Sequence, residues 1–226
     1  MTALNVLYED NHLLVIDKPA GVLVQGDKTG DKTIAEAVKN YLKAKYNKPG
    51  NVFLGTVHRL DRPVSGVLVF ARTSKALSRL NLQFKKRSVK KIYWALTENQ
   101  PPATAGILEH WLVKDRERNI TRTFSRPGKD AKKAVLEYKL LKSSNGVFLL
   151  EIYPQTGRSH QIRVQLASIG CPILGDLKYG SSRPNSDGNI CLHAREISFT
   201  HPVAHNELKI AAPLPVTKEW KQFDGL

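Results

Sequence analysis

Residues 58–76 read HRLDRPVSGVLVFARTSKA, and this stretch carries the signals that decide the fold. Gly66–Ala71 (GVLVFA) is a short continuous apolar run bounded by polar residues, which is typical of a buried strand. Ser74 is placed to cap a helix, and apolar residues then recur at core-facing spacing: Leu77, Leu80 and Phe84. We therefore expect a buried strand followed by a helix, with Asp61 just ahead of the strand.

The residues before this stretch predict a strand, a turn and a second helix. His12–Lys18 (HLLVIDK) is a short apolar run that closes at Pro19–Gly21, which reads as a strand ending in a turn. A helix is predicted over Thr33–Lys45, since Thr33 and Glu36 form a capping box. Its apolar face consists of Ile34, Val38, Tyr41 and Leu42.

Beyond residue 90 the pattern changes to strands. Lys91–Thr97 and Ala134–Leu141 are rich in residues that favour β structure, and Asn145-Gly146 is a hairpin turn signal before VFLLEIY. A helix is predicted over His160–Ile169, with Gly170 as its C-cap. Hairpins with scattered helices, and no repeating βαβ order, predict an α+β fold with an extended mixed, largely antiparallel sheet and flanking helices. Because no low-complexity segment separates two halves, we expect a single domain over residues 1–226.

The charge balance points to a polyanionic partner. The 226 residues carry a formal net charge of +15, and the sequence pI is about 9.9. Lys and Arg bind phosphates with release of condensed counterions, so nucleic acid is the favoured partner. An anionic membrane surface is the competing partner, but no segment has the form of a basic amphipathic helix.

Two stretches concentrate this positive charge. The first, Arg62–Leu96, has no Asp or Glu and nine basic residues: Arg62, Arg72, Lys75, Arg79, Lys85, Lys86, Arg87, Lys90 and Lys91. The second, Lys114–Lys133, has eight basic residues against Asp115, Glu117 and Asp130. Such blocks are typical of a surface that follows a phosphate backbone. The alternative is a solvated face that only keeps the protein soluble, although such a face normally mixes both signs.

Other classes of function find little support. The start of the chain carries Glu9 and Asp10 and does not read as a signal peptide, and no apolar stretch reaches the ~20 residues of a membrane helix. We expect a cytoplasmic protein with reduced thiols at Cys171 and Cys191, although one long-range disulfide stays open. His201 has a histidine neighbour four residues on, but a proline lies between them and zinc sites show tighter patterns. A P-loop and a dinucleotide glycine motif are absent from the sequence.

The segment VHRLDRPVSG contains polar residues that folding alone does not explain. Asp61 lies among His58, Arg59 and Arg62, and nearby guanidinium groups keep a carboxylate ionised. An ionised carboxylate in a fixed position can act as a nucleophile or a base. The structural alternative is an aspartate that caps a turn beside Pro63, with incidental arginines.

Two further segments share this property. GRSHQIR places polar side chains at the start of a helix, where anions bind well: Arg158, His160, Gln161 and Arg163. A bidentate pair between Arg163 and Asp61 would join two of the segments, while an ordinary solvated helix start is the alternative. In the third segment, Tyr93 and Trp94 point to opposite faces of a strand, so we expect one in the core and the other at a groove, as a platform for a nucleobase.

Taken together, these segments resemble the RluA-type RNA pseudouridine synthases over nearly the whole chain. The resemblance is carried by five segments in the family's order: YEDNHLLVIDKPAGVLVQ, HRLDRPVSGVLVFARTSKA, KIYWAL, GRSHQIRVQLASIGCPILGDLKYG and CLHAREISF. It implies a fold built on an extended sheet with a basic active-site cleft across it. Many relatives carry a small S4-type RNA-binding domain first. Because the motifs here start near Met1, we expect no such domain and target selection by the catalytic domain itself.

The resemblance also assigns roles. It makes Asp61 the essential aspartate, Tyr93 the tyrosine that stacks on the base, and Arg163 the arginine that pairs with the aspartate. The other polar residues of the two motifs are expected to bind the substrate: His58, Arg59, Arg62, Arg158, His160 and Gln161. The implied reaction flips a uridine out of structured RNA, breaks its bond to N1, rotates the uracil and rejoins it through C5. Such an isomerisation needs no cofactor and no metal.

Several alternatives stay open at this stage. The chain could be a catalytically silent RNA-binding or ribosome-assembly protein, a hydrolase that uses Asp61 with His58 as an acid–base pair, or a non-specific polyanion binder. The RNA is also open, with ribosomal RNA slightly favoured over transfer RNA. Whether Asp61 attacks C1′ or removes a proton from C2′ is not decided by any residue. We expect a monomer that does not bind membranes.

Overall fold

The structure is a computed structural model that describes residues 4–26 and 30–225. The chain falls into two compact units: Met1–Lys90 with Ala194–Pro213, and Lys91–His193 with Leu214–Leu226. Unit 1 contains β1 (Asn5–Glu9), β2 (Leu13–Lys18), α1 (Ile34–Lys45), β3 (Gly55–Thr56), β4 (Ser65–Ala71), α2 (Ser74–Lys86), most of β10 (Leu192–Thr200) and β11 (Glu207–Ala211). Unit 2 contains most of β5 (Lys90–Thr97), then β6 (Ala105–Asp115), β7 (Ile120–Phe124), β8 (Lys132–Ser144), β9 (Val147–Pro154), α3 (Gln161–Ser168), a 3₁₀ turn (Leu177–Tyr179) and α4 (Lys218–Lys221).

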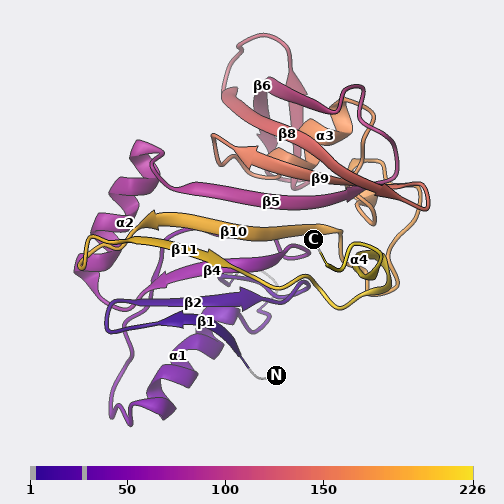
Figure 1. Cartoon of the computed structure of the whole chain (residues 1–226). Coiled ribbons are helices and arrows are strands. Elements are labelled where there is room, and N and C mark those ends of the chain that lie inside the picture. The colour runs from indigo at the N-terminus through magenta and orange to yellow at the C-terminus, as the bar shows by residue number, and fades with distance from the viewer. Residues whose placement is uncertain (1–3, 27–29, 226) are drawn as a thin grey trace. The chain divides into compact units, whose positions relative to one another are not determined.

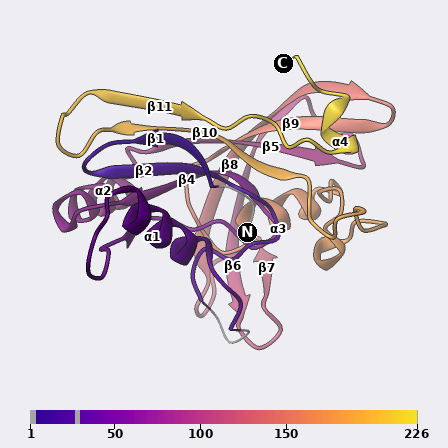
Figure 2. The ribbon, with the colours of Figure 1, turned by 90° about the horizontal axis from the view of Figure 1, so that it is seen from below.

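The strands of each unit are hydrogen-bonded to one another in a defined order (Figures 1 and 2). In unit 1 the order is β1-β2-β4-β10, with β11 paired to β10 and β3 to β4. In unit 2 it is β5-β9-β8-β6-β7, with every neighbouring pair antiparallel. The predicted α+β class with largely antiparallel pairing is confirmed. The expected extent of one domain, 1–226, stays a prediction, and its two ends lie outside the described residues.

The predicted buried strand is β4, and all seven of its residues are buried. Its odd-numbered valines and the facing residues of β2 form the core of unit 1 with α2, β10 and β11: Leu13, Val15, Val67, Val69, Ala71, Ala76, Leu80, Ile197, Phe199 and Ile210. The predicted cap of α2 was one residue late. Thr73 is the N-cap, because its hydroxyl accepts a hydrogen bond from the Ala76 amide, and Ser74 is the first helical residue.

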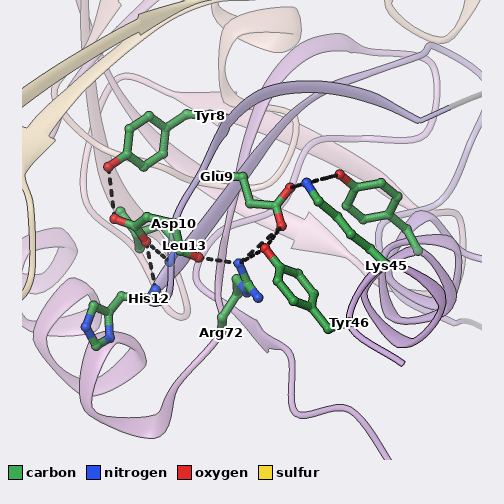
Figure 3. A network of polar contacts seen from close by, with 9 residues as sticks. Tyr8, Glu9, Asp10, His12, Leu13, Lys45, Tyr46 and Arg72 are labelled. Atoms are coloured by element: carbon green, nitrogen blue, oxygen red, sulfur yellow. Dashed lines mark hydrogen bonds and ion pairs between the residues drawn. The ribbon is translucent and has the colours of Figure 1, made fainter. Parts of the chain in front are cut away.

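The predicted capping box of α1 is confirmed, since Thr33 and Glu36 exchange both hydrogen bonds. Tyr41 is only partly buried, unlike its neighbours on the apolar face, because its hydroxyl donates to Glu9 at the end of β1. Figure 3 shows the network around that carboxylate. The Glu9 carboxylate also accepts hydrogen bonds from Lys45 and Tyr46, and it forms an ion pair with Arg72 just after β4.

In unit 2 the predicted hairpin turn is confirmed, with positive φ at both Asn145 and Gly146. The predicted helix over 160–169 is α3, with Gly170 in the left-handed region after its C-cap. One side of the β6–β8 sheet packs on α3 through Leu112, Ala134 and Val164. Within the described part of the chain, no helix is long and apolar enough to cross a membrane.

Gly66 is required by a close approach of two strands. Its φ of +111° lies in a region that residues with a side chain avoid. A Cβ at this position would lie 2.3 Å from the backbone oxygen of Ala194 in β10. Because that neighbour is backbone in a hydrogen-bonded sheet, it cannot move aside without breaking the pairing.

We expect Gly66→Ala to lower the free energy of unfolding by about 3 kcal/mol or more, since strain and overlap add. Gly170→Ala is the matched control, because its φ is +77° but an added Cβ would meet nothing within 4 Å. It should cost about 1–2 kcal/mol, the strain alone. Urea unfolding of both variants measures the difference, and equal losses would contradict the close-approach argument.

Candidate active site

Asp61 lies in a loop that a buried lysine holds in place. Lys18 ends β2 with a fully buried side chain, and its Nζ donates to the carbonyl oxygens of Pro19, Val22 and Arg62 at 2.8, 2.8 and 3.3 Å. The backbone adds a second link, since the Gly21 amide donates to the Arg62 carbonyl at 2.8 Å. The turn after β2 is therefore fastened to the residue that follows Asp61.

The loop also closes on itself. The Val64 amide donates to the Asp61 carbonyl at 3.1 Å, which forms a turn immediately before β4. The backbone of this aspartate thus begins a turn, while a cap of the turn by its side chain stays a prediction. Its side chain is partly buried, and its negative charge acts on the Lys18 ammonium. A carboxylate on a loop braced in this way has a defined direction, which suits nucleophilic or base chemistry.

The environment of Lys18 opposes its charge. Burial lowers the pKa of the ammonium to about 7, while the carboxylates of Asp61 and Asp17 raise it. Three carbonyl acceptors match the three N–H groups of the charged form, whereas the neutral amine has only two. The hydrogen bonds and the carboxylates therefore favour the ammonium, whereas burial favours the neutral amine.

The polar neighbours of Asp61 have different surroundings. His58 accepts a hydrogen bond from the Val69 amide at its Nε2 (3.1 Å), and its ring stacks on Phe84. These contacts join the imidazole to β4 and α2 and so help to stabilise unit 1. Arg62 is exposed, donates from Nε to the Gly21 carbonyl and pairs with Asp31. Arg59 is exposed. Substrate contacts of these side chains stay predictions.

Tyr93 and Trp94 divide as the strand pattern predicts. In β5, Tyr93 lies opposite Ile152 and Trp94 opposite Glu151 of β9, so their side chains point to opposite faces. Trp94 is 6% exposed and its indole donates to Glu151, whereas Tyr93 is only partly buried. Lys91 shares the Tyr93 face, and burial lowers the pKa of its ammonium.

Arg163 is held in a buried ion pair of unit 2. Its Nε and Nη2 donate to the two carboxylate oxygens of Asp176 at 2.6 and 2.7 Å. Arg163 is 5% exposed and Asp176 is 1% exposed. The Cζ atom lies 5.0 Å from the centre of the Tyr179 ring, over its face. The predicted pair of Arg163 with Asp61 joins residues of the two units and stays a prediction.

The other polar residues of the GRSHQIR segment make hydrogen bonds at the N-terminus of α3. Gln161 accepts hydrogen bonds from Thr156 and from the Arg158 amide, and it donates to the Val135 carbonyl. His160 is the N-cap, with a φ of +53°, and its Nδ1 lies 2.7 Å from the Tyr179 hydroxyl. Arg158 donates to the Lys133 carbonyl. The alternative of an ordinary solvated helix start is wrong, because residues 160–166 are all buried.

The two basic stretches differ in exposure. In the first, Arg72 is buried in its ion pair with Glu9, Arg79 donates to the Pro202 carbonyl, and Lys91 is partly buried. The second forms the β6–β7 hairpin and the connection to β8, and all eight of its basic residues are exposed: Lys114, Arg116, Arg118, Arg122, Arg126, Lys129, Lys132 and Lys133. Two of them have local partners, Lys114 with Ser159 and Lys133 with Glu109. The basic cleft itself stays a prediction.

Sequence reasoning missed Lys18, Asp176 and Tyr179 as parts of the site. Each stands in a quoted motif, IDKPAG or GDLKYG, so the signal was present. A lysine that ends an apolar strand just before Pro-Ala-Gly was the sign of a buried cation. In residues 4–26 and 30–225, no group of three or more His, Cys, Asp or Glu side chains is arranged to hold a metal ion.

Comparisons with known proteins show the family of the chain. The family model described as RNA pseudouridylate synthase matches residues 12–168. The ribosomal large subunit pseudouridine synthase C of Rickettsia prowazekii is 37% identical over 215 residues, which cover 93% of this chain and 68% of the relative. An uncharacterized RNA pseudouridine synthase of Bacillus subtilis, YhcT, is 33% identical over 94% of this chain and 69% of its own length.

A solved structure shows the same fold. Human RNA pseudouridylate synthase domain containing 4 superposes with a TM-score of 0.78 at 29% sequence identity, over 94% of this chain and 89% of that chain. The fold and these matches define an RNA-modifying isomerase. The chain belongs to the RNA pseudouridylate synthase family, and the resemblance to its RluA type is confirmed. Enzymes of this family convert uridine to pseudouridine in RNA.

We expect Lys18→Met to lower the free energy of unfolding by about 2–4 kcal/mol near neutral pH, since the buried side chain loses its hydrogen bonds to the carbonyls of Pro19, Val22 and Arg62. The deficit should grow as pH rises from about 7 toward 10.5. In that window the folded wild type has released the lysine proton while its unfolded chain still binds it, so wild-type stability gains with pH and the variant has no such gain.

Urea unfolding at about pH 6 and about pH 9 measures both effects. Lys39→Met, on the exposed side of α1, is the control and should change stability by less than about 0.5 kcal/mol. A deficit for Lys18→Met that shrinks with rising pH would contradict the lowered pKa.

Proposed function

We propose that this chain converts one or more uridines of large-subunit ribosomal RNA to pseudouridine, with Asp61 as the catalytic carboxylate. The observation that carries the proposal is the placement of Asp61 on a loop fixed by the Lys18 hydrogen bonds, in a chain of this family. The names of the relatives, ribosomal large subunit pseudouridine synthase C, support ribosomal RNA over transfer RNA.

The reaction is balanced without a further reactant. The C1′–N1 bond of the uridine breaks, the uracil turns, and a C1′–C5 bond forms. The proton on C5 is then lost, and N1 gains one. Asp61 would either add to C1′ as the uracil leaves or remove a proton from C2′. Both routes need an ionised carboxylate with a fixed direction, which the braced loop supports. No metal, nucleotide or redox cofactor takes part in the proposal.

Tyr93 and Arg163 have roles that follow from their chemistry. The partly buried phenol of Tyr93 would hold the detached uracil flat against its ring, since every base has a face that stacks. Arg163 would pair with Asp61 and keep it ionised and directed, which its planar guanidinium does better than a lysine. The pair with Asp176 supports this role, because it fixes the plane of that guanidinium.

Binding the RNA would rest on exposed cations. A base inside a duplex is out of reach, so the target uridine must be flipped out at a cost of a few kcal/mol. The exposed cations of the β6–β7 hairpin, together with Arg59 and Arg62, would hold the distorted backbone. His58, Arg158, His160 and Gln161 would support the binding surface through the loop and helix contacts described above. We further propose a cytoplasmic monomer that acts as a single catalytic domain.

The first test is pseudouridine mapping on RNA that lacks endogenous modification. Large-subunit ribosomal RNA, transfer RNA and partly assembled large subunits would each be incubated with wild type, Asp61→Ala and Asp61→Asn. We expect pseudouridine at defined positions of the ribosomal RNA with wild type, and a loss of at least roughly 10³-fold with both variants. Modification confined to transfer RNA would overturn the target. Activity retained in Asp61→Asn would overturn the role of Asp61.

A second variant separates the synthase from the hydrolase alternative. His58→Ala should reduce turnover by less than about 10-fold, because the imidazole is expected to stabilise the fold rather than transfer protons. A general acid or base at this position would cost about 10²–10⁴-fold. Initial rates corrected for the folded fraction decide between the two, and a loss in the larger range would favour the acid–base pair.

The two routes for Asp61 are also distinguishable. Removal of the C2′ proton breaks a C–H bond, whereas attack at C1′ leaves it intact. RNA with deuterium at C2′ of the target uridine should therefore react more slowly on the first route and at nearly the normal rate on the second. The measurement is a single-turnover rate with wild-type enzyme, so that product release does not hide the step.

A further inference from the structure

The guanidinium of Arg163 is held by contacts with two residues, Asp176 and Tyr179, and Tyr179 has no role in the proposal so far. Asp176 binds the edge formed by Nε and Nη2, and the guanidinium carbon lies over the Tyr179 ring, 5.0 Å from its centre. Because the guanidinium is planar, the bidentate contact at one edge and the ring beside its central carbon together set the direction of the edge formed by Nη1 and Nη2. Through that second edge an arginine can bind an anion with two parallel hydrogen bonds.

Asp176 is itself held rigidly. Its backbone amide donates to the Ile173 carbonyl, and its carbonyl accepts from the amides of Tyr179 and Ser181 at 3.0 and 3.1 Å. It also begins the 3₁₀ turn that places Tyr179 three residues later. One short segment, GDLKYG, therefore supplies both contacts to Arg163, and their spacing is set by a single helical turn.

Tyr179 is anchored at its far end. Its hydroxyl accepts a hydrogen bond from the Thr121 amide at 2.8 Å and lies 2.7 Å from His160 Nδ1. Thr121 is 2% exposed, and its own hydroxyl donates to the Ser159 carbonyl. The ring is thus tied to β7 and to the start of α3, the helix that carries Arg163.

We propose that Asp176 and Tyr179 are positioning residues for the reaction, which act through the direction they give to the Arg163 guanidinium. The inference rests on the proposed role of Arg163 and deepens it. Burial of a lone arginine is costly, so a carboxylate partner is expected on stability grounds alone. The aromatic ring and the two-point carboxylate contact go beyond charge neutralisation, because together they leave the guanidinium one orientation.

The test compares turnover with folding. Asp176→Asn keeps the shape of the side chain but replaces one acceptor by a donor that faces an N–H of Arg163. We expect kcat to fall by about 10–100-fold, the range for a small misplacement of a catalytic group, with KM for RNA within about threefold. Glu9→Gln is the control, since it breaks the buried ion pair with Arg72 in Figure 3. It should lower thermal stability without lowering kcat.

A double-variant cycle shows whether Asp176 acts through Arg163. In an Arg163→Met background the Asp176 carboxylate has lost the arginine that neutralised it, so adding Asp176→Asn should raise the unfolding temperature while kcat does not change further. Losses in kcat that multiply would overturn the proposal, because Asp176 would then act independently. An Arg163→Met enzyme with wild-type kcat would instead refute the proposed role of Arg163 itself and leave that of Asp61 intact.

Tyr179 supplies an independent measurement, which also serves if Asp176→Asn does not fold. Tyr179→Phe keeps the ring under the guanidinium and loses only the hydroxyl contacts, whereas Tyr179→Leu removes the ring. We expect the leucine variant to lose about 10-fold or more in kcat and the phenylalanine variant clearly less, at matched KM. Equal kcat for leucine variant and wild type would overturn the inference for Tyr179.

Discussion

A single buried ammonium connects the strand, the turn and the loop on which the site of unit 1 depends. Lys18 stands at the end of β2 with a fully buried side chain, and its Nζ donates to carbonyls on both the following turn and the Asp61 loop. Those carbonyls belong to irregular backbone that no strand partner could satisfy. The lysine thus supplies, from one ammonium, the hydrogen bonds that a strand partner would otherwise donate to these carbonyls.

Unit 2 also contains a buried cation, but the partners of that cation are different. Its buried cation, Arg163, is matched by a carboxylate and an aromatic face rather than by carbonyls. The difference suits the tasks proposed for the two side chains. An ammonium with three rotatable donors can gather carbonyls from several directions, while a guanidinium with a fixed fork transmits the orientation of its partner. Each unit therefore holds one cation whose hydrogen bonds define where a neighbouring group points.

Local signals in the sequence were sufficient for most of the fold. The capping box at Thr33, the Asn145-Gly146 turn and the apolar run of β4 each act through neighbours within a few residues, and each was predicted correctly. The cap of α2 was displaced by one residue because Thr73 and Ser74 are both good caps, and only the hydrogen bond to Ala76 distinguishes them. The strand and helix-start patterns indicated Tyr93 and Arg163, and the family resemblance assigned their roles. The partners that fix the site, Lys18 for the Asp61 loop and Asp176 for Arg163, meet their targets through the tertiary fold. The sequence alone therefore offered no spacing rule for them.

The left-handed backbone of His160 has a consequence for the way α3 begins. A helix normally enters through a serine, threonine or aspartate whose side chain occupies the first free amides. Here the N-cap side chain turns instead toward Tyr179, and no side-chain cap bond is made by His160. The first turn of α3 is thereby coupled to the ring beneath Arg163, and a histidine that bends the chain takes the place of a cap. The residue that starts this helix therefore adds no capping hydrogen bond, and its side chain instead holds the ring that lies beside the Arg163 guanidinium.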